Sequence, residues 1–180
     1  RTVRAAIARA MGGLERIESQ HVQSVLALAR GEGGSGSAEI PGGRAVRSFR
    51  EIKILRREAS QTRVPVELAP PFEVSAGGFA VTGRFDAAGA IDWERIAPPL
   101  RLKKWEPGDR FQPMDKSKSR PVREYFQKLR VPSWDRPFWP MISDSGGIIW
   151  IHGIGVAKRV AAGEGAARRL GVVCHKVSSK

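Results

Sequence analysis

The chain has a single cysteine, Cys174, among its 180 residues, so it cannot form an intrachain disulfide. A cysteine-rich zinc module is excluded for the same reason, and one free thiol suits a reducing compartment. Also missing is any apolar run near the roughly 18 residues that a membrane-spanning helix needs. The basic stretch after Arg1 has no secretory signal pattern. We therefore expect a cytoplasmic protein with no membrane partner.

The common catalytic motifs are missing too. The sequence contains neither HExxH nor GxxxxGK[ST], and its three histidines, His21, His152 and His175, fall in different expected elements. We interpret His21 as a surface or capping residue, His152 as structural and Cys174 as a small buried hydrophobe. No complete catalytic or metal-ligating set is recognisable. An enzyme site built on Asp109, His152 or Cys174 is the alternative.

Negative charge is in short supply. Lys and Arg total 31 against 18 Asp and Glu, for a net charge of +13. Residues 1–97 carry 14 basic and 11 acidic side chains, whereas residues 98–180 carry 17 and 7. The second segment is therefore net +10 against +3 for the first, and such a field attracts polyanions, above all nucleic acid. A basic surface that serves only solubility is the simpler alternative.

The uneven charge predicts two domains, residues 1–97 and 98–180. In the first, we expect helices over 1–18 and from Ser19 to 30, a glycine-rich loop over 31–37, a hairpin over 38–57, short strands over 64–85 with a turn at Gly77-Gly78, and a linker over 90–99. The chain begins at Arg1 rather than Met, which we expect of a fragment or a processed product.

The second domain alternates short strands with one helix. We expect a strand over 100–105, a turn over 107–111, a polar loop over 112–119, a helix over 120–130, a hairpin over 141–155 and a strand over 170–177. Pro121 suits the first turn of that helix, whose apolar face would hold Val122, Tyr125, Phe126 and Leu129. This order predicts an α+β fold with antiparallel strands rather than a parallel sheet.

Basic residues crowd the segment around the expected helix. Arg101 and Lys103 would share one face of the first strand, and Lys116, Lys118 and Arg120 lie in a loop that leads into the helix. Backbone amides and the helix dipole favour a phosphate at such a point. A loop–helix corner of this kind can hold a nucleic-acid backbone without reading its sequence. All five tryptophans fall within residues 93–150, most of them expected in the core and one or two available to stack on a base.

The same residues carry a family resemblance. A set of short motifs together resembles the C-terminal domain of the tRNA(Ile)-lysidine synthetase family: Arg101 and Lys103, PGDRFQP at 107–113, the Lys/Ser loop at 116–119, RPVREYF at 120–126, VPSW at 131–134, Pro140, IWIHG at 149–153 and Arg159. HVQSVLALARG at 21–31 and IPGG at 40–43 look like the middle region of that family. The resemblance covers most of the chain.

The resemblance implies the tRNA-binding part of a larger ligase. Members of the family join lysine to the wobble cytidine of an isoleucine tRNA that then reads AUA, and they use ATP with Mg²⁺ to adenylate the base. The catalytic domain lies N-terminal in the family, so we expect this chain to hold no cofactor and to be inactive alone. The implied partners are that tRNA, the catalytic domain and, as an open alternative, a second copy of the chain.

The residues and the resemblance together predict a tRNA-binding surface that contacts the acceptor stem. They predict no catalytic or metal-binding residue. The members of the surface are Arg101, Lys103, Arg110, Lys116, Lys118, Arg120, Arg123, Lys128 and Arg159. The alternative function is a basic RNA- or ribosome-binding module unrelated to lysidine synthesis.

Overall fold

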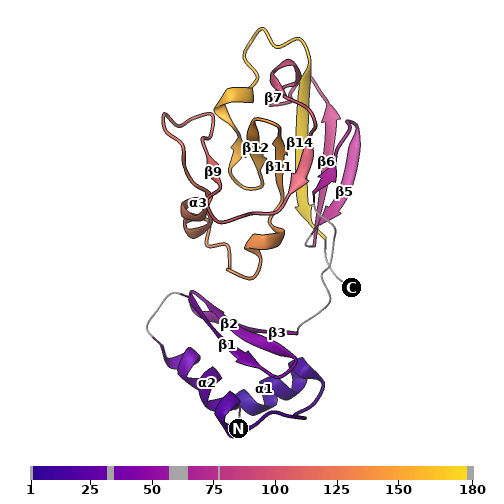
Figure 1. The fold of residues 1–180 in the computed structure, drawn as a ribbon. Helices are drawn as coiled ribbons and strands as arrows, with labels where there is room; N and C mark the ends of the chain where they lie inside the picture. The colour runs from indigo at the N-terminus through magenta and orange to yellow at the C-terminus, as the bar shows by residue number, and fades with distance from the viewer. Residues whose placement is uncertain (1, 32–34, 57–64, 77, 178–180) are drawn as a thin grey trace. The chain divides into compact units, whose positions relative to one another are not determined.

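The structure, a computed structural model, describes residues 2–31, 35–56, 65–76 and 78–177. The chain divides into two compact units (Figure 1): residues 1–61 with 132–134, and residues 62–131 with 135–180. Each unit has a hydrophobic core of its own. Residues 32–34 of the expected glycine-rich loop and Gly77 of the expected turn lie outside the described residues.

Two helices open the first unit. Helix α1 (Thr2–Met11) ends at Gly12, whose φ of +78° favours glycine. Helix α2 spans Ser19–Arg30. Its N-cap is Glu18, one residue before the start expected at Ser19. The Glu18 backbone amide donates to Nδ1 of His21 at 3.0 Å, and the Glu18 side chain accepts from the His21 amide in return. The capping role expected of His21 is thereby confirmed.

An antiparallel sheet completes this unit. It has the order β1-β2-β3, with bounds β1 (Ser35–Ile40), β2 (Gly43–Ser48) and β3 (Glu51–Arg56). The hairpin expected here is confirmed, but Ser35, Gly36 and Ser37 lie in β1 rather than in a loop. Apolar side chains from both helices, the segment between them and the sheet form the core, namely Ile7, Ile17, Val25, Ile40 and Ala45.

The second unit contains two larger sheets and a strand pair, and every pairing in the described residues is antiparallel. The five-stranded sheet has the order β13-β12-β11-β8-β4, with β4 (Val66–Glu67), β8 (Arg101–Lys103), β11 (Met141–Asp144), β12 (Gly147–Ile151) and β13 (Gly155–Val156). The four-stranded sheet has the order β5-β6-β14-β7, with β5 (Phe72–Ala76), β6 (Phe79–Phe85), β7 (Ile91–Asp92) and β14 (Arg169–Lys176). The pair joins β9 (Arg110–Phe111) to β10 (Arg120–Pro121).

Strand pairing between residues far apart in the sequence moves the boundary between the two units away from the expected position. Strand β14 pairs with β6 along its whole length and with β7 at its start, as Figure 1 shows. Ile91, expected in a linker, is 1% exposed and pairs with Leu170. The segment 90–99 is thus part of the second unit, where it also forms the short helix η1 (Trp93–Arg95). The division falls near residue 61 rather than between 97 and 98.

One core serves both sheets and the helix α3 (Val122–Lys128). Val122, Tyr125 and Phe126 are buried as expected, whereas Leu129 lies just after the helix and is 44% exposed. The helix is shorter than the expected 120–130 because Arg120 and Pro121 pair with β9. Short helices η2 (Arg136–Phe138) and η3 (Lys158–Val160) complete the unit.

The expected α+β class with antiparallel strands is confirmed. The expected hairpin over 141–155 corresponds to β11 and β12, and its tip lies at residues 144–147. The last expected strand corresponds to β14. Among the described residues, no helix has both the length and the apolar character needed to cross a bilayer.

Candidate nucleic-acid interface

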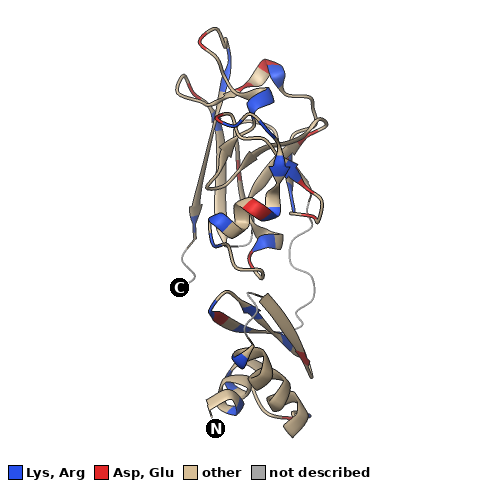
Figure 2. Ribbon diagram, turned by 90° about the vertical axis from the view of Figure 1, so that its left-hand side faces the viewer, with Lys and Arg blue, Asp and Glu red and all other residues tan. Residues whose placement is uncertain are grey.

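The cations predicted to bind tRNA all lie in the second unit. Figure 2 shows basic segments along α3 and on the short strands before it. Strand β8 carries Arg101 and Lys103, and β9 carries Arg110. The loop after β9 holds Lys116 and Lys118, and the rest lie at Arg120, Arg123, Lys128 and Arg159. Their environments differ, and they fall into three groups.

Lys103 is neutralised inside the fold. Its ammonium Nζ lies 2.8 Å from Asp109 Oδ1 and 3.3 Å from a Glu106 carboxylate oxygen. Burial by itself lowers the pKa of Lys103, but the hydrogen bonds and charges of Asp109 and Glu106 outweigh it, and the net pKa is raised. Asp109 also accepts from the Glu106 amide at 2.8 Å, so its carboxylate both caps this turn and pairs with Lys103. Lys103 therefore holds the 106–109 turn in place.

Arg159 has a similar internal partner. Its guanidinium donates to both carboxylate oxygens of Asp144 and to the Gly147 carbonyl. Asp144 is fully buried and also accepts from the amides of Ala97 and Gly146 at 2.9 and 2.8 Å. Burial raises the pKa of the Asp144 carboxyl, yet these hydrogen bonds and the Arg159 charge outweigh burial, so its net pKa is lowered. Arg159 thus anchors the β11–β12 hairpin.

A second group has partners that leave the charge in solvent. Lys116 pairs with Asp115 at 2.5 Å and Arg120 with Glu124 at 3.3 Å, and the paired side chains are 38–62% exposed. Arg110 donates to the Ser119 carbonyl at 2.9 Å and keeps its full charge. Exposed ion pairs contribute little to stability, so a phosphate can replace the carboxylate at low cost.

Four cations form the third group. Arg101, Lys118, Arg123 and Lys128 have no hydrogen bond or ion pair through their side chains within the described part of the chain. Arg101, Lys118, Arg123 and Lys128 are also exposed. These side chains are free to reach an anion, and together with the second group they make seven of the nine predicted residues whose charge stays available to an anion.

The expected phosphate site at the start of the helix is not supported. Helix α3 has only seven residues, so its dipole is small. The amide of Val122, its first residue, donates to the Asp109 carbonyl at 2.8 Å. Any attraction of phosphate to this corner must therefore come from the side chains.

Sequence reasoning left two neighbouring cations out of the site. Arg136 donates through Nε to the Val131 carbonyl at 3.1 Å, and its guanidinium carbon lies 6.0 Å from the centroid of the Phe126 ring. Lys104 Nζ lies 5.9 Å from the centroid of Phe138. A cation at these distances over an aromatic face is attracted by the ring. In the sequence, the clustering of cations and aromatic residues within 104–138 was the pattern that could have indicated these two residues.

Four of the five tryptophans lie in or against the core of the second unit, as expected of most of them. Trp105 packs edge-on against Phe126, and Trp93 packs edge-on against Phe85. Trp139 packs against Phe79 and donates through Nε1 to the His152 carbonyl at 2.9 Å. Stacking on an RNA base stays a prediction.

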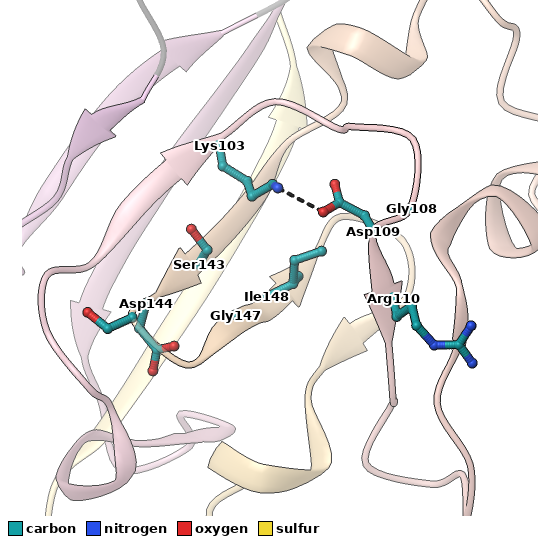
Figure 3. A pocket seen from close by; sticks show the side chains of 9 residues that line it. Lys103, Gly108, Asp109, Arg110, Ser143, Asp144, Gly147 and Ile148 are labelled. Carbon is teal, nitrogen blue, oxygen red and sulfur yellow. Dashed lines mark hydrogen bonds and ion pairs between the residues drawn. The ribbon is translucent and has the colours of Figure 1, made fainter.

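The structure does not assemble the alternative catalytic set. A cavity of about 390 Å³ lies between the 106–109 turn and the β11–β12 hairpin (Figure 3), and Asp109 lines it, but His152 and Cys174 do not. His152 packs among aromatic rings, and burial lowers its pKa. Burial raises the pKa of Cys174 to about 11, so its thiol is a poor nucleophile at neutral pH. Within the described ranges, no group of three or more His, Cys, Asp or Glu could hold a metal ion.

Comparison with known proteins assigns the family. Residues 100–172 match the family model described as "TilS substrate C-terminal domain". The chain is 33% identical over 193 residues to the tRNA(Ile)-lysidine synthase of Solibacter usitatus (strain Ellin6076), an alignment that covers 96% of the chain and 43% of that protein. It is 29% identical over 184 residues to the tRNA(Ile)-lysidine synthase of Geobacter sulfurreducens (strain ATCC 51573 / DSM 12127 / PCA), with 92% and 39% covered.

A solved structure, "Crystal structure of TILS C-terminal domain", superposes with a TM-score of 0.56 at 25% identity and covers 63% of this chain and 96% of its own. The chain spans less than half the length of the two curated relatives above. Residues 100–172 are therefore a TilS C-terminal domain, and the chain that carries them is a relative of the tRNA(Ile)-lysidine synthases.

Proposed function

We propose that this chain is the tRNA-binding portion of a tRNA(Ile)-lysidine synthase and that it holds the acceptor stem. The observation that most supports this proposal is that the TilS C-terminal domain presents exposed cations, without internal partners among the described residues, along β8, the 112–119 loop and α3. Phosphates attract such side chains without regard to base sequence. A-form RNA hides its base edges in a deep, narrow groove, so a broad basic surface suits a stem better than a sequence-reading pocket.

The residues we assign to this surface are those whose charge stays available in the fold. They are Arg101, Arg110, Lys116, Lys118, Arg120, Arg123 and Lys128. We leave Lys103 and Arg159 out of this surface, because each is held by a carboxylate within the fold. Their loss would disturb the turn and the hairpin rather than remove a phosphate contact.

The whole protein then acts as a ligase that joins lysine to the wobble cytidine of the AUA-reading isoleucine tRNA. ATP with Mg²⁺ and lysine are its co-substrates, and we assign their binding to a catalytic domain outside this chain. The role of this chain is positioning: by fixing one end of the tRNA, it brings the anticodon to that domain. We place the protein in the cytoplasm. A homodimer is the alternative to a monomer, and a sedimentation measurement distinguishes the two.

Lysidine formation should require more than this chain. We expect the isolated 180-residue protein, incubated with ATP, Mg²⁺, lysine and unmodified isoleucine tRNA, to release no pyrophosphate and to form no lysidine. The reason is that nothing in the described residues resembles an adenylation site. Mass spectrometry of the digested tRNA measures the product, and a complete lysidine synthase serves as the positive control. Product above the no-protein background would refute the division of labour.

Salt should weaken tRNA binding steeply. If about five phosphates are contacted, the plot of log association constant against log salt concentration has a slope of roughly −4. Fluorescence anisotropy with labelled isoleucine tRNA at several salt concentrations measures it. Competition with unlabelled tRNA, duplex DNA and ribosomal RNA fragments distinguishes a tRNA reader from a general RNA- or ribosome-binding module. Equal competition by all three would favour the module.

A further inference from the structure

Arg136 is held in an unusual position for a surface cation. Its Nε donates to the Val131 carbonyl, and its guanidinium lies over the Phe126 ring. The two terminal nitrogens make no hydrogen bond or ion pair within the described residues. The side chain is thus fixed at one edge and open at the other, so little side-chain entropy is lost when its free edge binds a ligand.

Arg123 is a second cation close to Arg136. It precedes Phe126 by three residues on α3, and residues at that spacing are neighbours on a helix surface. Burial, and next the positive charge of Arg123, lower the pKa of Arg136, as expected for two guanidinium groups close to each other. Figure 2 shows basic segments on both α3 and the short helix η2 that carries Arg136. The guanidinium that lies over Phe126 therefore has a second positive charge as its neighbour.

The protein does not neutralise this pair from within. Glu124, the acid next to Arg123, is engaged by Arg120 at 3.3 Å. Asp135, the acid next to Arg136, forms no ion pair within the described residues. Two neighbouring guanidinium groups without a counter-charge repel each other, and an anion between them removes that repulsion.

The charge of the pair selects the anion. A phosphodiester in an RNA backbone carries one negative charge, whereas a phosphate monoester carries about −1.5 to −2 at pH 7. Two guanidinium groups match the monoester in charge, and they offer parallel N–H donors to its three terminal oxygens. In RNA such a group is found at a phosphorylated chain end.

We propose that Arg123 and Arg136 form a clamp for a terminal phosphate monoester of RNA. The proposal rests on the tRNA-binding function proposed above and deepens it, because a clamp for a chain end would fix where along the acceptor stem the domain sits. Phe126, which lies under the Arg136 guanidinium, also packs against Trp105 in the core.

The test compares two RNA hairpins of identical sequence, one with a 5′ phosphate and one with a 5′ hydroxyl. We expect the full chain to bind the phosphorylated hairpin about tenfold more tightly, the effect of a single net charge-assisted hydrogen bond. Isothermal titration calorimetry at fixed salt measures both affinities. Equal affinities would overturn the clamp.

Three variants assign the effect to the pair. Arg123→Gln, which removes an exposed side chain without a partner, and Arg136→Lys, which keeps the charge but loses the Nε bond, should each reduce the preference for the 5′ phosphate below about twofold. Arg101→Gln is the matched control: it should weaken binding of both hairpins equally and keep the preference. Thermal melts of all three confirm that they fold. A preference that survives both Arg123→Gln and Arg136→Lys would refute the assignment.

A small-molecule arm separates this proposal from the proposed function. The side-chain Nε–H signals of Arg123 and Arg136 are followed by NMR as methyl phosphate or dimethyl phosphate is added. We expect methyl phosphate alone to shift both signals. That result in a chain that fails to bind tRNA would leave the clamp standing and refute the proposed function. Binding of tRNA with no response to methyl phosphate would refute the clamp and leave the proposed function standing.

Discussion

Replacing Asp144 by alanine is expected to lower the free energy of unfolding of the second unit by about 3 kcal/mol. The Asp144 side chain is fully buried and accepts from the Arg159 guanidinium and from the amides of Ala97 and Gly146. Without it, Arg159 keeps its charge with no counter-ion, and two amides lose their acceptor. Urea unfolding followed by tryptophan fluorescence measures the change.

Asp115→Ala is the matched control for this experiment. It removes a carboxylate from a pair with Lys116 in which both side chains are about 60% exposed, and such a pair contributes only about 0–1 kcal/mol. A change for Asp144→Ala no larger than that of the control would show that the buried pair does not hold the hairpin.

The pH dependence of the same carboxyl gives an independent readout. Because its net pKa is lowered in the fold, ionised Asp144 stabilises the protein above the ordinary carboxyl pKa, and this contribution is lost as pH falls through the lowered value. Wild-type protein should therefore lose more stability between pH 7 and pH 2 than Asp144→Asn does. Parallel losses in the two proteins would contradict the assignment.

Removing four cations together should nearly abolish tRNA binding. In the variant with Lys116, Lys118, Arg120 and Arg123 changed to alanine, four of about five phosphate contacts are lost, so the salt slope should flatten from roughly −4 to about −1. The same relation predicts an affinity loss on the order of a thousandfold at 0.1 M salt. Anisotropy titrations over a range of salt concentrations measure both quantities.

A second quadruple variant controls for net charge. Changing Arg4, Arg9, Arg84 and Lys176 to alanine removes the same charge from exposed positions outside the proposed surface. We expect it to keep the steep salt slope and most of the affinity. Similar losses in both variants would mean that only the overall charge attracts tRNA and that no localised surface exists.

Local patterns predicted the second unit best where neighbouring residues determine the structure. The apolar spacing of Val122, Tyr125 and Phe126 located α3, and the polar tip at 144–147 located the hairpin. The segment 90–99 was misjudged because its only strand has two residues and pairs with residues 169–170, far along the chain. No local pattern carries that information.

The same limit explains which site residues changed role. Arg101 and Lys103 both lie on strand β8, as expected. Whether the charge of each is free depends on carboxylates that turns bring close to it. Asp109 reaches Lys103 through the 106–109 turn, and Asp144 reaches Arg159 across 15 residues of chain. Charge counts locate a basic surface, but only the folded turns show which cations face outward.

The position of β14 has a consequence for how the molecule is made. This strand is hydrogen-bonded between β6 and β7, which precede it by about 80 residues, and Leu170 within it is fully buried. During synthesis from the N-terminus, β5 and β6 leave the exit tunnel long before their central partner does. The edge of β6 that pairs with β14 therefore stays unpaired until residues 169–176 have been translated, so the four-stranded sheet is completed only when this late strand is available.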